Sequence, residues 1–226
     1  APGLKLPLAD TLRAGQHALL AHGRAVQTIR AAVAQARIAW LPVPLATVPA
    51  DPAKPADVEA ARAQFWALEP PWGGRSFWNN RWWNDAVLAG GYPAEGREFY
   101  GPDAPACTAE EAALIASPVD LLALNLYTAL PITAGPDGRP QAATLPPGQD
   151  RQLVQHWPVL PDCLYWTARF LHERYRLPMV VAENGYSAYD LLDDDGSCPD
   201  PGRIIYLRRH LAAVARARAE GLPIEG

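Results

Sequence analysis

The sequence predicts an α/β protein built around a parallel sheet. Three short apolar segments, residues 37–43, 119–127 and 178–182, have the character of buried strands, and long helical patterns separate them. Parallel strands are covered by helices on both faces, so they form nearly continuous apolar runs. Strands that alternate with helices along the chain are typical of this class. We therefore expect a single domain that spans residues 1–226.

Composition narrows the class of protein. The chain has 226 residues, of which 49% are hydrophobic and 19% charged, which is enough for a sizeable core. A net charge of -4 with dispersed Lys and Arg argues against a nucleic-acid partner. The longest apolar stretches are interrupted by polar residues or Pro, so we expect no membrane span.

The three cysteines, Cys107, Cys163 and Cys198, are far apart and lack metal-ligand spacing. Free thiols are typical of a reducing compartment, and no export signal is visible, so we expect a cytoplasmic protein without metal or cofactor. The sole methionine is Met179, and the chain opens on Ala1-Pro2-Gly3, which favours a piece of a longer protein.

The first half of the chain is expected to be mainly helical. A helix is predicted from Asp10, as its cap, to about Ala36, and the first strand follows at 37–43. A second helix should run from about Ala56 to Leu68, between flanking prolines. Residues 72–100 are rich in aromatic side chains, and 77–88 could form a helix. We expect the tryptophans near here to pack in a core: Trp66, Trp72, Trp78, Trp82 and Trp83.

The second half carries the other two strands. Thr108 and Glu111 have the spacing of a capping box, which predicts a short helix to Ile115. The strand at 119–127 is followed by a long loop at 135–155, rich in Gly, Pro and Gln. Further helices are expected at 161–175 and 203–219, on either side of the strand at 178–182.

Glu183 stands where the third strand meets the Asn184-Gly185 turn. In barrels of alternating strands and helices, the C-terminal ends of the strands carry the catalytic residues. A carboxylate there can attack an anomeric carbon and form a glycosyl-enzyme ester that water hydrolyses. The alternative is a structural Glu that ends a strand, and for the isolated motif this alternative is favoured about three to one, since short motifs often match by chance.

Three further residues are candidates for the same site. Asn125 and Tyr127 alternate at the end of the second strand, so their side chains should share a face. The Tyr127 phenol could orient the carboxylate of Glu183 by hydrogen bonding, and Asn125 could bind a sugar hydroxyl or that carboxylate. Trp157, in the loop region between the strands, could stack on the apolar face of a sugar ring, or it could be a core residue.

Taken together, these segments resemble glycoside hydrolase family 1, the β-glucosidase and β-galactosidase family. Asp120-Leu121-Leu122-Ala123-Leu124-Asn125-Leu126-Tyr127-Thr128 is similar to the family's Asp-Phe-x-Gly-x-Asn-Tyr-Tyr-Thr strand, and Val180-Val181-Ala182-Glu183-Asn184-Gly185 resembles its Ile-Thr-Glu-Asn-Gly nucleophile motif. Other collinear blocks lie at 1–3 with 17–23, at 80–85 with 91–93, and at 203–211.

The resemblance implies a (β/α)8 TIM barrel, of which residues 1–226 form a partial domain with strands five to seven. It implies a retaining β-glycosidase that hydrolyses small β-glycosides or oligosaccharides, with Glu183 as nucleophile and Tyr127 as its hydrogen-bonding partner. Asn125 and Trp157 would bind substrate, and Trp157 would lie beside the leaving group. The missing part of the barrel is then a possible partner.

The chain departs from the family pattern at 41–44, at 72–74 and at Ala182, where Thr is common, and two further departures concern its ends. The acid/base Glu of the family's Asn-Glu-Pro motif would lie upstream of Ala1, and Glu69-Pro70 only superficially resembles it, because it follows the fifth strand rather than the fourth. The chain also stops at Gly226, before the expected eighth strand. We therefore expect an isolated chain to be inactive or nearly so. A truncated, non-catalytic carbohydrate-binding or partner-binding relative is the alternative, and another retaining barrel glycosidase is a third, less favoured one.

Overall fold

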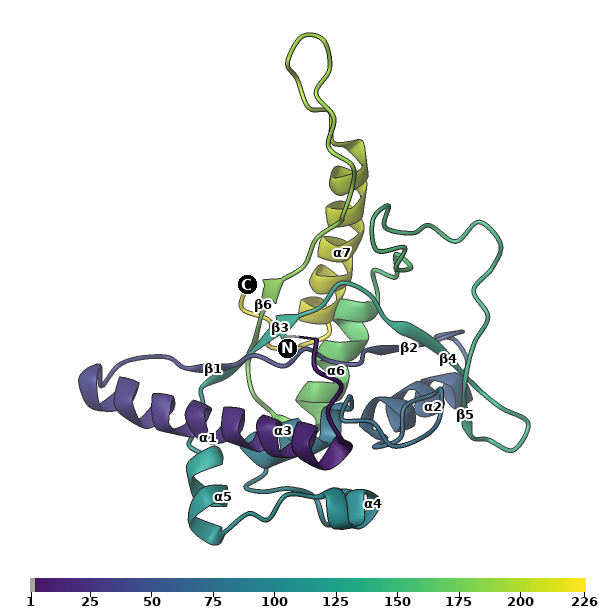
Figure 1. The fold of residues 1–226 in the computed structure, drawn as a ribbon. Coiled ribbons are helices and arrows are strands. Elements are labelled where there is room, and N and C mark those ends of the chain that lie inside the picture. Colours follow the sequence, from purple (N-terminus) through teal and green to yellow (C-terminus); the bar gives the residue numbers. More distant parts are fainter. Residues whose placement is uncertain (1–2) are drawn as a thin grey trace. The chain divides into compact units, whose positions relative to one another are not determined.

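The computed structural model describes residues 3–226, so Ala1 and Pro2, part of the first family block, lie outside the described residues. Helices and strands follow one another in runs in the first two thirds of the chain, such as the helices at 55–115 and the strands at 121–142, and alternate only near its end (Figure 1). The residues separate into two compact units. One contains the chain up to Trp40 together with 66–121, and the other contains 41–65 and 122–226.

The first unit is mainly helical. Its longest element is α1, Leu8–Ala32, and the two-residue strand β1, Ala39–Trp40, follows. Short helices make up the rest: α3 at Asn80–Leu88, α4 at Ala94–Tyr100, the 3-10 turn η1 at Gly101–Asp103, and α5 at Ala109–Ile115.

Trp82 is at the centre of the core of this unit and is fully buried. Its ring stacks on Tyr92, with centroids 4.0 Å apart, and meets Tyr100 edge-on at 4.9 Å. Asn79 caps α3 by accepting a bond from the Trp82 backbone N–H, and its amide donates to the Tyr100 hydroxyl. Within the aromatic-rich segment, Trp82 therefore belongs to the core, whereas Trp72 is 63% exposed and does not.

Close contact between α1 and α5 requires a glycine. A Cβ atom on Gly23 would lie 2.0 Å from the carbonyl oxygen of Leu114, so only glycine lets the two helices approach this closely. Farther along, Arg30 forms an ion pair with Asp120 at 2.8 Å, and Asp120 also accepts a hydrogen bond from the Ile38 backbone N–H. These contacts fix the chain on both sides of β1 within the first unit.

The second unit contains two sets of strands. In the first, β3, Leu121–Asn125, pairs in parallel with β6, Met179–Glu183. The last four residues, 223–226, continue this pairing on β6 through a parallel bridge between Ile224 and Met179. In the second set, β2, Thr47–Pro49, pairs in parallel with β4, Leu130–Ala134, and β4 pairs with antiparallel β5, Pro140–Ala142.

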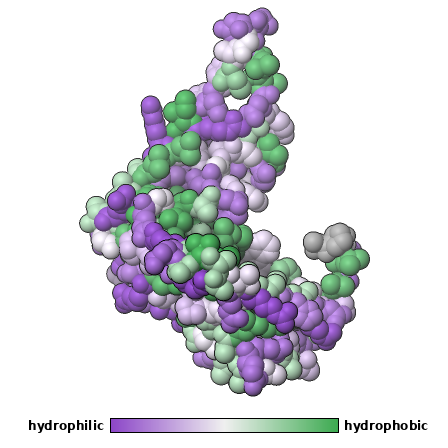
Figure 2. Space-filling view, turned by 90° about the vertical axis from the view of Figure 1, so that its left-hand side faces the viewer, coloured by the Kyte–Doolittle hydropathy of each residue, from purple (hydrophilic) through white to green (hydrophobic). Residues whose placement is uncertain are grey.

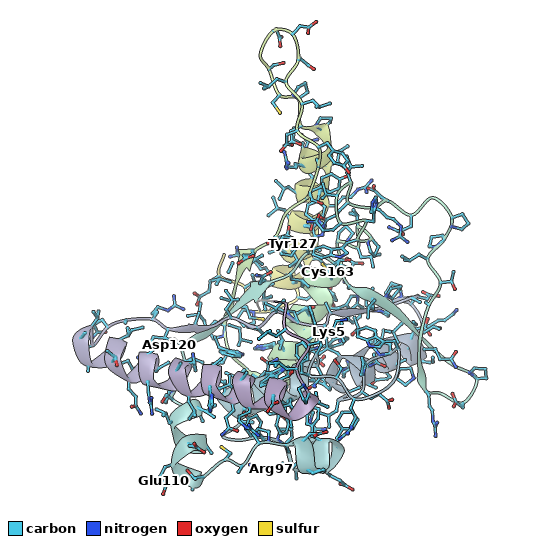
Figure 3. All side chains as sticks on the ribbon, viewed as in Figure 1. Lys5, Arg97, Glu110, Asp120, Tyr127 and Cys163 are labelled. Atoms are coloured by element: carbon cyan, nitrogen blue, oxygen red, sulfur yellow. The ribbon has the colours of Figure 1, made fainter. Side chains whose placement is uncertain are left out.

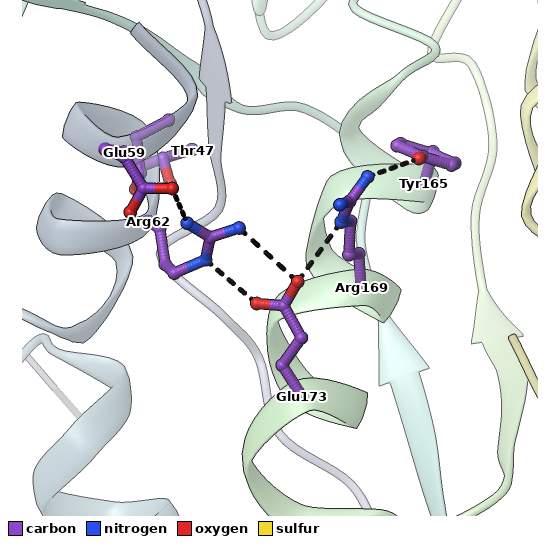
Figure 4. Close-up of polar contacts among 7 residues, drawn as sticks. Thr47, Glu59, Arg62, Tyr165, Arg169 and Glu173 are labelled. Atoms are coloured by element: carbon purple, nitrogen blue, oxygen red, sulfur yellow. Dashed lines mark hydrogen bonds and ion pairs between the residues drawn. The ribbon is translucent and has the colours of Figure 1, made fainter. Parts of the chain in front are cut away.

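Three helices cover these strands: α2 at Pro55–Trp66, α6 at Cys163–Tyr175 and α7 at Pro201–Ala219. Helices α6 and α7 run side by side (Figure 1). Arg62 of α2 binds Glu173 of α6 at 2.9 Å, and Arg169 bonds to the same carboxylate at 3.1 Å (Figure 4). Charge-assisted bonds therefore connect α2 with α6 where their apolar faces, including Phe65 and Phe170, are in contact.

The structure confirms most of the predicted elements and shifts several of their ends. The long helix begins at Leu8 rather than Asp10, which lies in the first turn instead of capping it. The capping box of Thr108 and Glu111 is present. The strand predicted at 37–43 is only two residues long. Five elements were missed: β2, α4, η1, β4 and β5, of which β5 lies in the predicted long loop.

No helix within residues 3–226 is both long and apolar enough to cross a bilayer. The face drawn in Figure 2 mixes hydrophilic and hydrophobic side chains. Within the second unit, the loop before α7 extends past the start of that helix (Figure 1). It exposes Leu191 and Leu192 next to the acidic residues 193–195.

A buried carboxylate, Asp57, connects α2 to β4. It accepts hydrogen bonds from the Thr133 hydroxyl at 2.9 Å, the Ala134 N–H at 3.0 Å and the Asp51 N–H at 3.2 Å. The bond from the Ala134 N–H is the main cause that lowers the pKa of Asp57. The ionised form is therefore the one that the fold stabilises.

We expect Asp57→Ala to lower the free energy of unfolding by about 1–3 kcal/mol at pH 7, because it removes the acceptor of three partly buried donors. A carboxyl whose pKa is lowered in the folded state stabilises the fold at pH values above its unfolded pKa of about 3.9. This contribution is lost as the pH falls through the folded-state pKa. Urea unfolding of both proteins at several pH values should thus show a difference that shrinks below about pH 4. Asp194→Ala, in the exposed loop, is the control, and a pH-independent difference would contradict the assignment.

Candidate active site

The strands β3 and β6 end side by side, and a β-bulge sets the direction of Glu183. Leu124 pairs with Val181, but the next residue, Asn125, pairs with Glu183, so Ala182 is an extra residue without a partner on β3. Side chains alternate between the faces of a strand, so one extra residue moves the next side chain to the other face. Glu183 therefore comes to the face of Asn125 rather than that of Leu124.

Tyr127 lies just beyond β3 and is labelled in Figure 3. Its phenol donates a hydrogen bond to Oε2 of Glu183 at 2.8 Å. This bond is the main cause that raises the pKa of Tyr127, because the phenol can make it only while it keeps its proton. The negative charge of Glu183 also opposes the loss of that proton. The expected contact between the two side chains is thus present, although Glu183 itself is an exposed residue.

Trp157 is 41% exposed, and its indole ring lies 6.0 Å from the ring of Tyr127 at an angle of 46°. A tight turn holds it there. The preceding residue, His156, has a φ of 56°, a conformation that few residues other than glycine adopt. The Thr128 hydroxyl donates to the carbonyl of Pro158 at 2.8 Å, which ties the turn to the chain that follows β3.

Two polar side chains, the half-buried Asn184 and the buried Tyr206, connect the chain segments next to Tyr127 and Glu183. The amide of Asn184 donates to the Leu126 carbonyl at 2.7 Å and to the Tyr206 hydroxyl at 3.0 Å. Tyr206 in turn donates to the carbonyl of Tyr127 at 3.1 Å. Burial raises the pKa of Tyr206, so it stays a neutral donor. These two side chains therefore join α7 to the ends of both strands.

The ring of His210 stacks on Tyr206 with centroids 3.7 Å apart. Its Nδ1 lies 2.9 Å from the Tyr206 carbonyl oxygen. Burial lowers the pKa of His210, which keeps the imidazole uncharged at neutral pH. The uncharged ring fills the space under the phenol and supports the position of Tyr206.

A cavity of about 500 Å³ opens next to Tyr127. Aromatic and uncharged polar side chains form its wall together: Tyr127, Gln152, Gln155, Trp157, Asn184 and residues 185–187. Aromatic faces beside amide and hydroxyl groups can stack on a sugar ring and hydrogen-bond to its hydroxyls. Among residues 3–226, no group of three or more His, Cys, Asp or Glu side chains could hold a metal ion.

The structure thus brings together all four residues proposed from the sequence. Asn125 is paired with Glu183 in the sheet, Tyr127 is bonded to it, and Trp157 lies beside Tyr127. Their roles in catalysis and binding stay predictions. Glu69, the other carboxylate weighed, belongs to the first unit and accepts a bond from the Gly74 backbone N–H.

Three residues of the site were not found from the sequence. Asn184 was interpreted as part of a turn, although an amide directly after a candidate nucleophile could have indicated a second function. Tyr206 lies within a predicted helix, and its contact with Asn184 depends on how α7 packs. Gln152 lay in a segment without periodicity, so no local pattern pointed to it.

Comparison with known proteins identifies the family of the chain. The sequence profile of glycosyl hydrolase family 1 matches residues 1–226. Beta-glucosidase A of Thermotoga maritima is 27% identical over 227 residues, which cover 100% of this chain and 48% of that enzyme. The beta-glucosidase of an Agrobacterium species is 30% identical over 221 residues, with 95% and 45% covered.

Solved structures give the same result. The family 1 β-glucosidase from Thermotoga maritima superposes with a TM-score of 0.78 at 25% identity, and covers 100% of this chain and 48% of its own. Its complex with glucoimidazole superposes equally well, with a TM-score of 0.78. The fold is thus an α/β fold that matches half of a family 1 TIM barrel.

The chain belongs to glycosyl hydrolase family 1. It spans about half the length of the curated relatives that it matches.

We expect Glu183→Gln to lower the pKa of Tyr127, because the substitution removes the negative charge that opposes loss of the phenol proton. The tyrosine Cζ resonances of a ¹³C-labelled protein, followed over pH, measure this pKa, and Tyr127→Phe assigns the signal. Glu220→Gln is a matched control, since it alters the separate pair of Tyr165 and Glu220. An unchanged Tyr127 titration in Glu183→Gln would show that the phenol and carboxylate do not interact in solution.

Proposed function

We propose that this chain carries the nucleophile half of a retaining β-glycosidase active site that hydrolyses β-glucosides. The hydrogen bond from Tyr127 to Glu183 is the observation that carries the proposal. It supports Glu183 as the nucleophile, because a nucleophilic carboxylate must be held in one orientation toward the anomeric carbon. Membership of the family and the β-glucosidase relatives support the same reaction.

In the proposed mechanism, an Oε atom of Glu183 attacks the anomeric carbon while an acid protonates the departing glycosidic oxygen. The glycosyl ester on Glu183 is then hydrolysed by water, and two inversions leave the anomeric configuration retained. The two carboxyl groups of such a site lie about 5 Å apart. We propose that the acid comes from sequence outside these 226 residues.

Tyr127 is proposed to orient Glu183, and Asn125 to bind a hydroxyl of the sugar next to the attacked carbon. Trp157 would stack on the leaving group. The wall of the cavity beside it carries the exposed amide of Gln155 and the phenol of Tyr186. This polar lining favours a hydroxylated leaving group, as in a β-linked oligosaccharide, over a purely apolar one.

We further propose that β1, β3 and β6 are strands five, six and seven of the family barrel, and that residues 223–226 begin strand eight. The parallel bridge from Ile224 to Met179 supports this last assignment. The remaining part of the barrel is then the expected partner of this chain. The relatives are about twice as long as the matched segment, which leaves enough sequence for it.

Covalent labelling tests the nucleophile. The reagent is a 2-deoxy-2-fluoro β-glucoside whose leaving group is dinitrophenolate. Dinitrophenolate leaves without being protonated, so formation of the glycosyl ester needs no acid. In the longest polypeptide that contains this chain, we expect one label per molecule, mapped by mass spectrometry to the peptide with Glu183. Glu183→Gln should abolish labelling, and Glu69→Gln, the other carboxylate weighed, should leave it unchanged.

Labelling at another residue would refute Glu183 as the nucleophile. Binding of glucoimidazole by a protein that is never labelled and never hydrolyses a glucoside would instead favour the non-catalytic carbohydrate-binding alternative.

We expect the 226-residue chain alone to hydrolyse an unactivated β-glucoside at least about a hundredfold more slowly than the longer polypeptide, because general acid catalysis is typically worth two to four orders of magnitude. Release of glucose from cellobiose, measured with both proteins at equal concentration, checks this. Turnover by the chain alone that Glu183→Gln abolishes would contradict the expectation.

A further inference from the structure

We infer that Gln152 is a positioning residue that fixes the position of the Trp157 indole relative to the ends of β3 and β6. The inference rests on the proposed function and deepens it, because it names a side chain outside the reacting groups that sets the geometry of the leaving-group side.

The side chain of Gln152 is buried at 1% exposure in a loop whose neighbouring residues, 151 and 153, are exposed. Its amide nitrogen lies within hydrogen-bonding distance of the Tyr127 carbonyl at 3.5 Å and of the Gly185 carbonyl at 3.4 Å. Its amide oxygen accepts from the Ser187 N–H at 3.2 Å and from the Ser187 hydroxyl at 3.1 Å. One amide therefore connects the chain after β3 with the chain after β6.

The backbone of Gln152 holds the turn that presents Trp157. Its N–H donates to the carbonyl of Trp157 at 2.9 Å, and its carbonyl accepts from the N–H of His156 at 3.0 Å. The backbone of Gln152 holds the turn and its side chain bonds to the ends of both strands, so loss of the amide removes one link between the turn and those ends. Trp157 has no comparable apolar burial to hold it, since it is 41% exposed.

The chemistry of the position fits an amide and no other common side chain. Two carbonyl oxygens on one side need a donor, and an N–H and a hydroxyl on the other side need an acceptor. A carboxylate of the same length would place negative charge against two carbonyls. An apolar side chain would remove all four contacts, although the Tyr127 carbonyl would keep the bond from Tyr206. A buried residue that merely filled space would not need both functions.

The proposed effect on the reaction follows from geometry. A platform displaced by about 1 Å can lower the rate by up to about a hundredfold, although no reacting group has changed. In the longer polypeptide, we expect Gln152→Ala to lower kcat/KM for cellobiose by about ten- to a hundredfold. The rise in KM should be the larger part, since Trp157 binds the leaving group and does not react.

The decisive experiment reports on Trp157 directly and needs no activity. The chain has eight tryptophans, so 5-fluorotryptophan labelling gives a short ¹⁹F spectrum, in which Trp157→Phe assigns the resonance of Trp157. We expect Gln152→Ala to shift or broaden this resonance and leave most others in place. Ser187→Ala removes only one bond to the amide oxygen, so it should cause a smaller shift and keeps the test valid if Gln152→Ala fails to fold.

Gln149→Ala is the matched control. Gln149 is a glutamine of the same loop, but its amide donates to the carbonyls of Asp150 and Val159 and reaches neither strand end. We expect the Gln149→Ala variant to have the same Trp157 resonance and the same kcat/KM as the unchanged protein. A Trp157 resonance that Gln152→Ala and Ser187→Ala both leave unshifted would overturn the inference, as would a shifted resonance with unchanged kcat/KM. Absence of glycosidase activity in the longer polypeptide would refute the proposed function, and the ¹⁹F spectra would still decide whether Gln152 positions Trp157.

Discussion

The parallel pairing of β3 with β6, and the bulge that ends it, is the constraint on which the rest of the site depends. The pairing brings residues 125 and 183 together although nearly sixty positions separate them in sequence. If Ala182 paired with Asn125 in a regular ladder, the alternation of the strand would turn Glu183 toward the face of Leu124. Bulges are frequent next to active sites because they redirect one side chain without disturbing the sheet. The contact between Tyr127 and Glu183 is thus set by backbone register first and by side-chain chemistry second.

Backbone pairing ends at the last residues of β3 and β6, and hydrogen bonds from polar side chains connect the chain segments that follow. Asn184 and Tyr206 join the chain after β3 to β6 and to α7, and Gln152 joins the same two chain segments from the side of the Trp157 turn. Such groups are costly to bury unless every donor and acceptor is paired. Where they are paired, they rigidify the loop ends, which in most proteins are the more mobile part of the structure.

The sequence predicted what depends on local pattern and missed what depends on packing. Apolar runs indicated β3 and β6, and the spacing of Thr108 and Glu111 indicated the start of α5, because both signals lie within a few residues. Asn125, Tyr127 and Glu183 were proposed from their places at strand ends. Gln152, in contrast, owes its role to partners 25 to 35 positions away, which no periodicity reveals. The bulge at Ala182 was missed for the same reason, since it is a property of the pair of strands.

The exposure of Glu183 bears on how this site could work. Electrostatic stabilisation of a transition state is strong where water is excluded, and a carboxylate beside bulk solvent has little of this advantage. Ala182 and Glu183 are exposed at the end of β6, while Met179 at its start is buried, so the wall is open on the side where a sugar would bind. The family relatives are about twice as long as the segment that this chain matches. A site with an oriented carboxylate and an open wall is what half of such a barrel should contain, because the orientation comes from neighbouring strands and the exclusion of water needs the whole ring.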